Sequence, residues 1–146
     1  MQINRLTPDL AAGPQIAPVD VETLAALGFR SIIGNRPDGE APDQPTFASV
    51  EAAAREHGLE TCHIPVVASQ IDDQDIGTFG QALRDLPKPI FAFCRTGTRS
   101  TLLWALANND QLTTEERLRI AAAHGYDISG FRAKLEAADE GPSDHA

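Results

Sequence analysis

The chain has 146 residues, of which 42% are hydrophobic and 23% are charged, and its formal net charge is -9. This composition predicts one soluble globular domain with its own core, and the acidic surface argues against nucleic acid or an anionic membrane as a partner. The sequence has no apolar run of the roughly 18 residues that span a bilayer, and no N-terminal apolar segment typical of a signal peptide. Its two cysteines, Cys62 and Cys94, are too few for a disulfide framework, so the expected location is the reducing cytoplasm.

Helical and extended patterns alternate along the chain. Short edge strands are predicted within residues 5–16, and further strands at 29–33, 59–65 and 90–93. Helices are predicted at 19–27, 47–57, 72–86, 99–109 and 117–124. A capping box formed by Thr113 and Glu116 precedes the last of these helices, and a final helix is predicted to end near Ala138.

This alternation predicts an α/β fold: a central, mostly parallel sheet flanked by helices, with accessory C-terminal helices. The domain is expected to span residues 1–139, with a flexible tail at 140–146. Ligands of such sheets bind beyond the C-terminal ends of the strands. The loops that follow Ile33, Pro65 and Phe93 are therefore expected to meet at one site.

The segment 91–100, with the sequence FAFCRTGTRS, predicts a reactive cysteine. A strand delivers Cys94 to the start of a helix, where backbone N–H groups and the helix dipole stabilise a thiolate. Gly97 permits the tight backbone path of an anion-binding nest, and Arg99 can bind an oxyanion through two N–H groups. We predict that Cys94 and Arg99 are catalytic. Five further residues are predicted to bind the anion: Arg95, Thr96, Gly97, Thr98 and Ser100.

Ser100 is also predicted to donate a hydrogen bond to the thiolate. Arg36 lies on a loop that is expected to overhang the site, where it would help to bind an anionic substrate. The alternative is that Arg36 belongs to a loop held together by ion pairs with Asp38 and Glu40.

If the bound anion is a phosphate ester, its hydrolysis also needs a general acid that protonates the leaving group. Asp72 and Asp73 are the candidates. They also fit a simpler interpretation, in which they cap and charge the first turn of the following helix. Cys62 is either a resolving thiol or, more simply, a residue that fills the core. The histidines lack the spacing of metal ligands, so neither a metal nor another cofactor is expected.

The cysteine loop matches two loop types. Protein tyrosine and dual-specificity phosphatases place five residues between cysteine and arginine, and a histidine before the cysteine. This chain has four residues between Cys94 and Arg99, and Phe93 precedes the cysteine. Its Cys-Arg-x-Gly-x-Arg pattern resembles the shorter loop of rhodanese sulfurtransferases. A tighter loop suits a single sulfur atom better than a tetrahedral phosphoryl group.

A second resemblance covers about residues 4–107 and extends into the segment GYD at 125–127. It is carried by the stretches NRL at 4–6, IIGNRPDGE at 32–40, HIPV at 63–66 and FCRTGTRS at 93–100, followed by Leu103 and Trp104. These resemble the beta-lactamase-hydrolase-like, phosphatase-like domain family. The resemblance implies a dual-specificity-phosphatase-like fold and an activity described in the family as either phosphatase or sulfurtransferase. Members occur alone or fused to a metallo-hydrolase of the persulfide dioxygenase type, and the stand-alone form is expected here.

From these observations the sequence predicts a cysteine-dependent sulfurtransferase linked to sulfide and persulfide metabolism. Cys94 would attack a sulfane-sulfur donor such as thiosulfate or glutathione persulfide, carry the sulfur as a persulfide and pass it to a thiol acceptor. A persulfide dioxygenase is a further expected partner. Two alternatives remain open: a phosphatase that forms a phosphocysteine, and a persulfide- or redox-sensing binding module.

Overall fold

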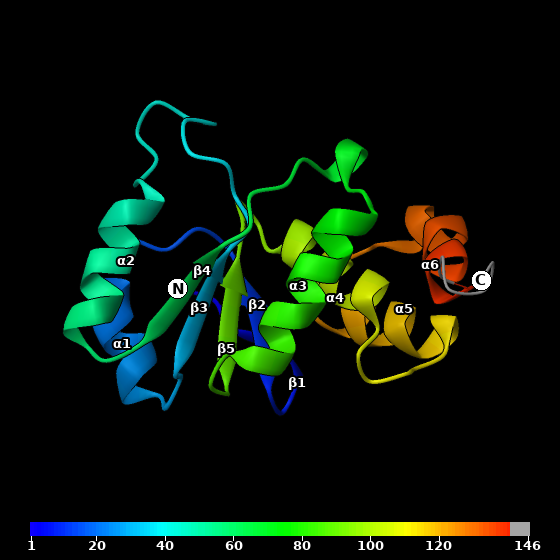
Figure 1. Cartoon of the computed structure of the whole chain (residues 1–146), viewed down its shortest axis with the longest axis horizontal. Helices are drawn as coiled ribbons and strands as arrows, with labels where there is room; N and C mark the ends of the chain where they lie inside the picture. Colours follow the sequence, from blue (N-terminus) through cyan, green and yellow to red (C-terminus); the bar gives the residue numbers. More distant parts are fainter. Residues whose placement is uncertain (141–146) are drawn as a thin grey trace.

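The structure, a computed structural model, describes residues 1–140 (Figure 1). Five short strands form one sheet in the order β1-β2-β5-β3-β4 within this part of the chain. The strands are β1 (Asn4–Thr7), β2 (Leu10–Gly13), β3 (Ser31–Gly34), β4 (Glu60–His63) and β5 (Ile90–Phe93). β1 is antiparallel to β2, and every other pairing is parallel. The predicted mostly parallel sheet is therefore confirmed.

Six helices cover the two faces of this sheet within residues 1–140 (Figure 1). They are α1 (Asp20–Ala26), α2 (Phe47–Glu56), α3 (Asp73–Asp85), α4 (Thr98–Ala107), α5 (Thr114–Ala123) and α6 (Arg132–Glu140), with short 3-10 turns at Ala68–Gln70 and Ser129–Phe131. α1 and α2 lie on one face, and α3 to α6 lie on the other (Figure 1). None of these helices is long and apolar enough to cross a membrane.

The core consists of two apolar layers, one on each face of the sheet. Ile32 and Phe91 pack toward α1 and α2, whereas their strand neighbours Ile33 and Ala92 pack toward α3 and α4. This alternation follows from the two-residue period of a strand, and it buries β5 completely. The residue that follows β5, Cys94, is thus held by a strand packed on both faces.

Most elements begin or end within a few residues of their predicted bounds. The final helix runs from Arg132 to Glu140, slightly beyond its predicted end near Ala138. No glycine or proline interrupts the chain between Phe131 and Gly141, which is why the helix continues beyond Ala138. The rest of the predicted tail, residues 141–146, lies outside the described residues.

Candidate active site

Cys94 lies between the end of β5 and the start of α4. Only about 1% of its surface is exposed. The backbone N–H of Gly97 donates a hydrogen bond to Cys94 Sγ at 3.0 Å. Gly97 has φ of +103°, a left-handed conformation that turns the loop back over the sulfur. The sulfur is thus almost fully covered and lies against the backbone of its own loop.

The first turn of α4 adds further donors beside the sulfur. The first intrahelical hydrogen bond runs from Thr101 N–H to the Gly97 carbonyl, at 3.0 Å. In helix geometry the N–H groups of Thr98, Arg99 and Ser100 therefore have no carbonyl partner within α4, although that of Thr98 donates to Thr96 Oγ1 at 3.4 Å. Together with the helix dipole, such groups form a binding site for an anion.

Tyr126 fixes the shape of the cysteine loop from the C-terminal part of the chain. Its hydroxyl donates to the carbonyl of Thr96 at 3.1 Å and accepts from Asn4 Nδ2 at 2.8 Å. Burial raises the pKa of Tyr126, which keeps the hydroxyl a donor. A Cβ added to Gly97 would lie 2.2 Å from the Tyr126 hydroxyl oxygen. Tyr126 lies in the segment 125–127 that shares the family resemblance, but no local pattern links it to the cysteine loop, so its role could not be predicted.

Arg99 joins the three loops that the sequence analysis expects to meet. Its Nη1 and Nη2 bind the two carboxylate oxygens of Glu40 at 2.7 and 2.9 Å. Nη1 also donates to the carbonyl of Val66 at 3.0 Å. Hydrogen bonding to Glu40 raises the pKa of Arg99, and the charge of Cys94 acts in the same direction. The guanidinium therefore lies beside Cys94 and is held from two neighbouring loops.

The way in which Arg99 binds Glu40 leaves one edge of its guanidinium unused by Glu40 and Val66. A guanidinium has five N–H donors, and these contacts use both N–H groups of Nη1 and one of Nη2. The Nε–H and the outer hydrogen of Nη2 form a second, parallel pair. This pair has the spacing that binds two oxygens of a carboxylate or phosphate.

Glu40 is the acidic partner of both arginines near the site. Arg36 Nε also binds it, at 3.0 Å. The hydrogen bond from Arg99 is the main reason that the pKa of Glu40 falls to about 2. Glu40 is therefore ionised at neutral pH and orients Arg99 rather than donating a proton. From the sequence alone, Glu40 is predicted only as part of an ion-paired loop.

Arg36 is largely buried, with 7% of its surface exposed. Besides Glu40 it binds the side-chain oxygen of Gln15, through Nη1 at 3.2 Å. The contact with Glu40 is the ion pairing that was the alternative role for Arg36, whereas Asp38 accepts from the N–H of Phe47 instead. Its predicted part in anion recognition stays a prediction.

Ser100 does not make the hydrogen bond that the sequence predicts. Its hydroxyl donates to Asn35 Oδ1 at 2.7 Å instead of to Cys94. Asn35 is fully buried, and its Nδ2 donates to the carbonyl of Ile64 at 2.9 Å. A buried amide must satisfy its donors and its acceptor, so Asn35 takes the serine hydroxyl. The pair connects the start of α4 to the ends of β3 and β4.

The candidate general acids Asp72 and Asp73 have structural positions at the start of α3. Asp72 is the N-cap residue, and its carboxylate accepts from the N–H of Asp75 at 2.9 Å. The Asp75 carboxylate accepts from the N–H of Asp72 in return, which completes a capping box. Asp73 lies in the first turn of the helix. This geometry favours the capping interpretation for both residues.

A cavity of about 500 Å³ opens beside the cysteine loop. It is lined by Arg36, Glu40, Ala41, Pro42, Arg95 and Arg99. Arg95 is exposed, and its carbonyl accepts a hydrogen bond from Gln15 N–H at 3.2 Å. The cavity therefore gathers positive charge on a chain whose net charge is -9.

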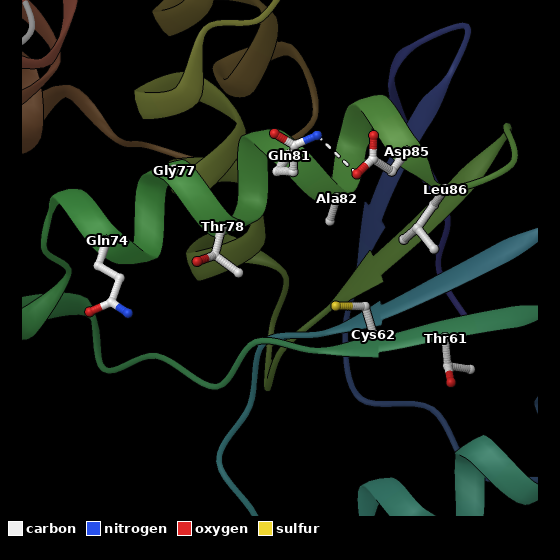
Figure 2. Close-up of a pocket in the computed structure, with 9 residues that line it drawn as sticks. All are labelled: Thr61, Cys62, Gln74, Gly77, Thr78, Gln81, Ala82, Asp85 and Leu86. Atoms are coloured by element: carbon white, nitrogen blue, oxygen red, sulfur yellow. Dashed lines mark hydrogen bonds between the residues drawn. The ribbon is translucent and has the colours of Figure 1, made fainter. Parts of the chain in front are cut away.

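Cys62 lies on β4 beside a separate, mostly apolar cavity of about 580 Å³ between this strand and α3 (Figure 2). Burial raises the pKa of the Cys62 thiol, so it is a poor nucleophile at neutral pH. Cys62 pairs with Ile33, which pairs with Ala92. Two strand spacings, about 9–10 Å, exceed the roughly 7 Å between Cα atoms that a disulfide allows, and Cys94 lies two residues further along. The structure therefore favours the core-filling interpretation over a resolving thiol.

Potential metal ligands are dispersed. His63 stacks on Phe47 with ring centroids 4.3 Å apart, and its Nε2 lies 3.2 Å from the carbonyl oxygen of Arg36. Within residues 1–140, no group of three or more His, Cys, Asp or Glu side chains is arranged to hold a metal ion.

Comparison with known families identifies the relatives of this site. The model of the beta-lactamase hydrolase-like protein, phosphatase-like domain, matches residues 2–111. The chain belongs to this family. The family resemblance seen in the sequence is thereby confirmed, and the match contains β1 to β5, the cysteine loop and α4.

Similar proteins include beta-lactamase hydrolase-like proteins from Agrobacterium fabrum and Xylella fastidiosa strain 9a5c. They are 37% and 34% identical over 93% of this chain. The aligned region is 31% and 32% of those proteins, so the chain spans about a third of their length. A candidate phosphatase from Neisseria meningitidis, known as a crystal structure, is 37% identical with a TM-score of 0.86. That alignment covers 94% of this chain and 99% of the other.

More distant structures show the fold alone. Kinase-associated phosphatase is 17% identical with a TM-score of 0.66, over 90% of this chain and 83% of that one. Tk-PTP in its active form is 15% identical with a TM-score of 0.69, over 92% and 93%. The predicted dual-specificity-phosphatase-like fold is therefore confirmed.

Proposed function

We propose that this chain hydrolyses phosphate monoesters through a phosphocysteine formed on Cys94. The observation that carries the proposal is the pairing of Cys94, held under the Gly97 N–H, with an Arg99 whose Nε side is used by neither Glu40 nor Val66. The family is a phosphatase-like domain, and phosphatases share the fold. These comparisons support the phosphatase alternative better than the sulfurtransferase that the sequence analysis preferred.

The reaction proceeds in two displacements. The Cys94 thiolate attacks phosphorus, so that an S–P bond forms and the P–O ester bond breaks, and the departing oxygen takes a proton from solvent. A water molecule then attacks phosphorus, the S–P bond breaks and inorganic phosphate leaves while one proton is released. Arg99 and the N–H groups at the start of α4 bind the phosphoryl oxygens in both steps.

The direct test is hydrolysis of an aryl phosphate by the whole chain and by two matched cysteine variants. Cys94→Ser should lose at least about a thousandfold in kcat because it removes the nucleophile. Cys62→Ser should keep the wild-type rate, since Cys62 lies two strands away. Activity that survives in Cys94→Ser would contradict the proposal.

Sulfur transfer remains a second candidate, favoured by the four-residue spacing between Cys94 and Arg99. In that reaction Cys94 takes a sulfane sulfur from thiosulfate, releases sulfite and delivers the sulfur to an acceptor thiol. Steady turnover of thiosulfate with glutathione, together with no hydrolysis of aryl phosphates, would establish this candidate in place of the phosphatase.

A further inference from the structure

The cavity beside the cysteine loop has a composition that the hydrolysis of a simple phosphate ester does not require. Three arginines and one carboxylate line it, which gives a local charge of about +2 at neutral pH. Cys94 is not among its lining residues. The cavity therefore lies next to the Cys94 site, and the two share Arg99. A substrate whose phosphoryl group is bound by Arg99 would place its remaining part here.

Within this cavity, Arg95 is the arginine available to the part of the substrate that lies beyond the phosphoryl group. Arg99 and Arg36 both bind Glu40. Arg95 makes no side-chain hydrogen bond or ion pair within residues 1–140, and its side chain is exposed on the cavity wall. Its backbone is nevertheless fixed, because its carbonyl accepts from Gln15, whose side chain binds Arg36. A cation on a fixed base is suited to recognising a charge at a set distance from the phosphoryl group.

We propose that this cavity is a subsite for a second acidic group of the substrate, and that Arg95 determines this specificity. The substrate class is a small phosphate monoester that carries an additional carboxylate or phosphate. The size of the cavity, about 500 Å³, suits a small molecule. This proposal rests on the proposed function, because it takes the phosphoryl group to be bound at Arg99.

Binding to the Cys94→Ser protein separates the subsite from catalysis. The probes are 3-carboxyphenyl phosphate and 3-carbamoylphenyl phosphate, which have nearly the same shape and differ by one negative charge. Calorimetry should show that the carboxylate compound binds about fivefold more tightly, which is the scale of one partly exposed ion pair. The preference should shrink in about 0.5 M salt, because salt screens exposed charges.

Adding Arg95→Gln should reduce this preference to about one, since the amide keeps polarity without charge. Arg30→Gln is the matched control. Arg30 is also exposed, but it precedes β3 and so lies at the N-terminal ends of the parallel strands, whereas the cysteine loop lies at their C-terminal ends. The preference should therefore be unchanged in Arg30→Gln. Equal binding of the two compounds, binding of neither, or a preference that survives Arg95→Gln would overturn the subsite.

Turnover by the wild-type chain tests the underlying function separately. Hydrolysis of both compounds without an Arg95-dependent preference would leave the phosphatase standing and remove the subsite. An Arg95-dependent binding preference without hydrolysis of either compound would leave the subsite standing and remove the phosphatase.

Discussion

Glu40 determines how the guanidinium of Arg99 faces the cysteine loop. It binds the Nη1 and Nη2 groups and leaves unused the Nε side, where the proposed phosphoryl group would bind. Replacement with Gln keeps the shape of Glu40 but removes the charge that holds Arg99. We expect Glu40→Gln to lower kcat/KM for aryl phosphates by about 10–100-fold through misplacement of Arg99. A variant with wild-type kcat/KM would show that Glu40 has no positioning role.

The same residue predicts a dependence of stability on pH. The pKa of Glu40 is about 2 in the folded chain and near its ordinary 4.5 when unfolded. A lowered carboxyl pKa stabilises the fold above about pH 4.5, and this contribution is lost as pH falls toward 2. Because Glu40 retains 29% side-chain exposure, we expect only about 1–2 kcal/mol. Urea unfolding should give the wild type a larger free energy of unfolding than Glu40→Gln at pH 7. This difference should shrink as the pH falls below about 4.5.

The states of the nearby carboxyl groups predict which esters are hydrolysed fastest. Glu40 is ionised and Asp72 caps a helix, so neither is placed to protonate a departing oxygen. Rates should therefore fall steeply as the pKa of the leaving alcohol rises, by about tenfold per pKa unit. A series of substituted phenyl phosphates measures this slope. A flat dependence would reveal an efficient general acid and would return Asp72 and Asp73 to consideration.

Gly97 is constrained by both its backbone conformation and its surroundings. An alanine there would combine a φ of +103° with a Cβ located 2.2 Å from the Tyr126 hydroxyl. Gly58 is the matched control, since its φ is +75° and nothing lies within 4 Å of the position that an alanine methyl group would take. In urea unfolding we expect Gly58→Ala to cost about 1 kcal/mol and Gly97→Ala at least about 2 kcal/mol more. Equal costs would show that Tyr126 does not constrain the loop.

At the level of elements, Arg117 connects the accessory helices. It lies on α5 and is fully buried. Its guanidinium donates to the carbonyl of Ala105 on α4 and pairs with Asp139 on α6. Replacing Arg117 with Met would leave that carbonyl and the carboxylate without their donor, at a cost of about 3–5 kcal/mol. Urea unfolding would measure the loss, and Arg119→Met, at an exposed position of the same helix, should change stability by less than about 0.5 kcal/mol.

A loss for Arg117→Met no larger than that for Arg119→Met would mean that the accessory helices pack without this network. The sequence predicted these helices but not how they are joined. Capping signals are local, and the box at Thr113 and Glu116 is present as predicted. The contact from Arg117 to Asp139 spans 22 residues, and no local pattern marks Arg117 as buried.

The same contrast between local and distant contacts holds for the whole molecule. The layers of the fold and the meeting of three loops follow from alternating elements and parallel crossovers, so they could be predicted. Glu40 and Arg99 are 59 residues apart, and Asn4 and Tyr126 are 122 apart. Such contacts depend on how the folded elements bring side chains together. For this reason the sequence predicts Cys94 and Arg99 as neighbours in one loop but not that Glu40 orients Arg99 or that Tyr126 holds the loop.

The measurement that tests the central claim most directly is the mass of the group carried by Cys94 during turnover. The wild-type chain is mixed with an aryl phosphate, quenched within milliseconds to seconds and digested, and a parallel sample is treated with thiosulfate. The account predicts one phosphoryl group on the peptide that contains Cys94, none on the Cys62 peptide and none in Cys94→Ser. A single added sulfur on Cys94 in the thiosulfate sample, with aryl phosphate neither hydrolysed nor leaving a phosphoryl group, would contradict it.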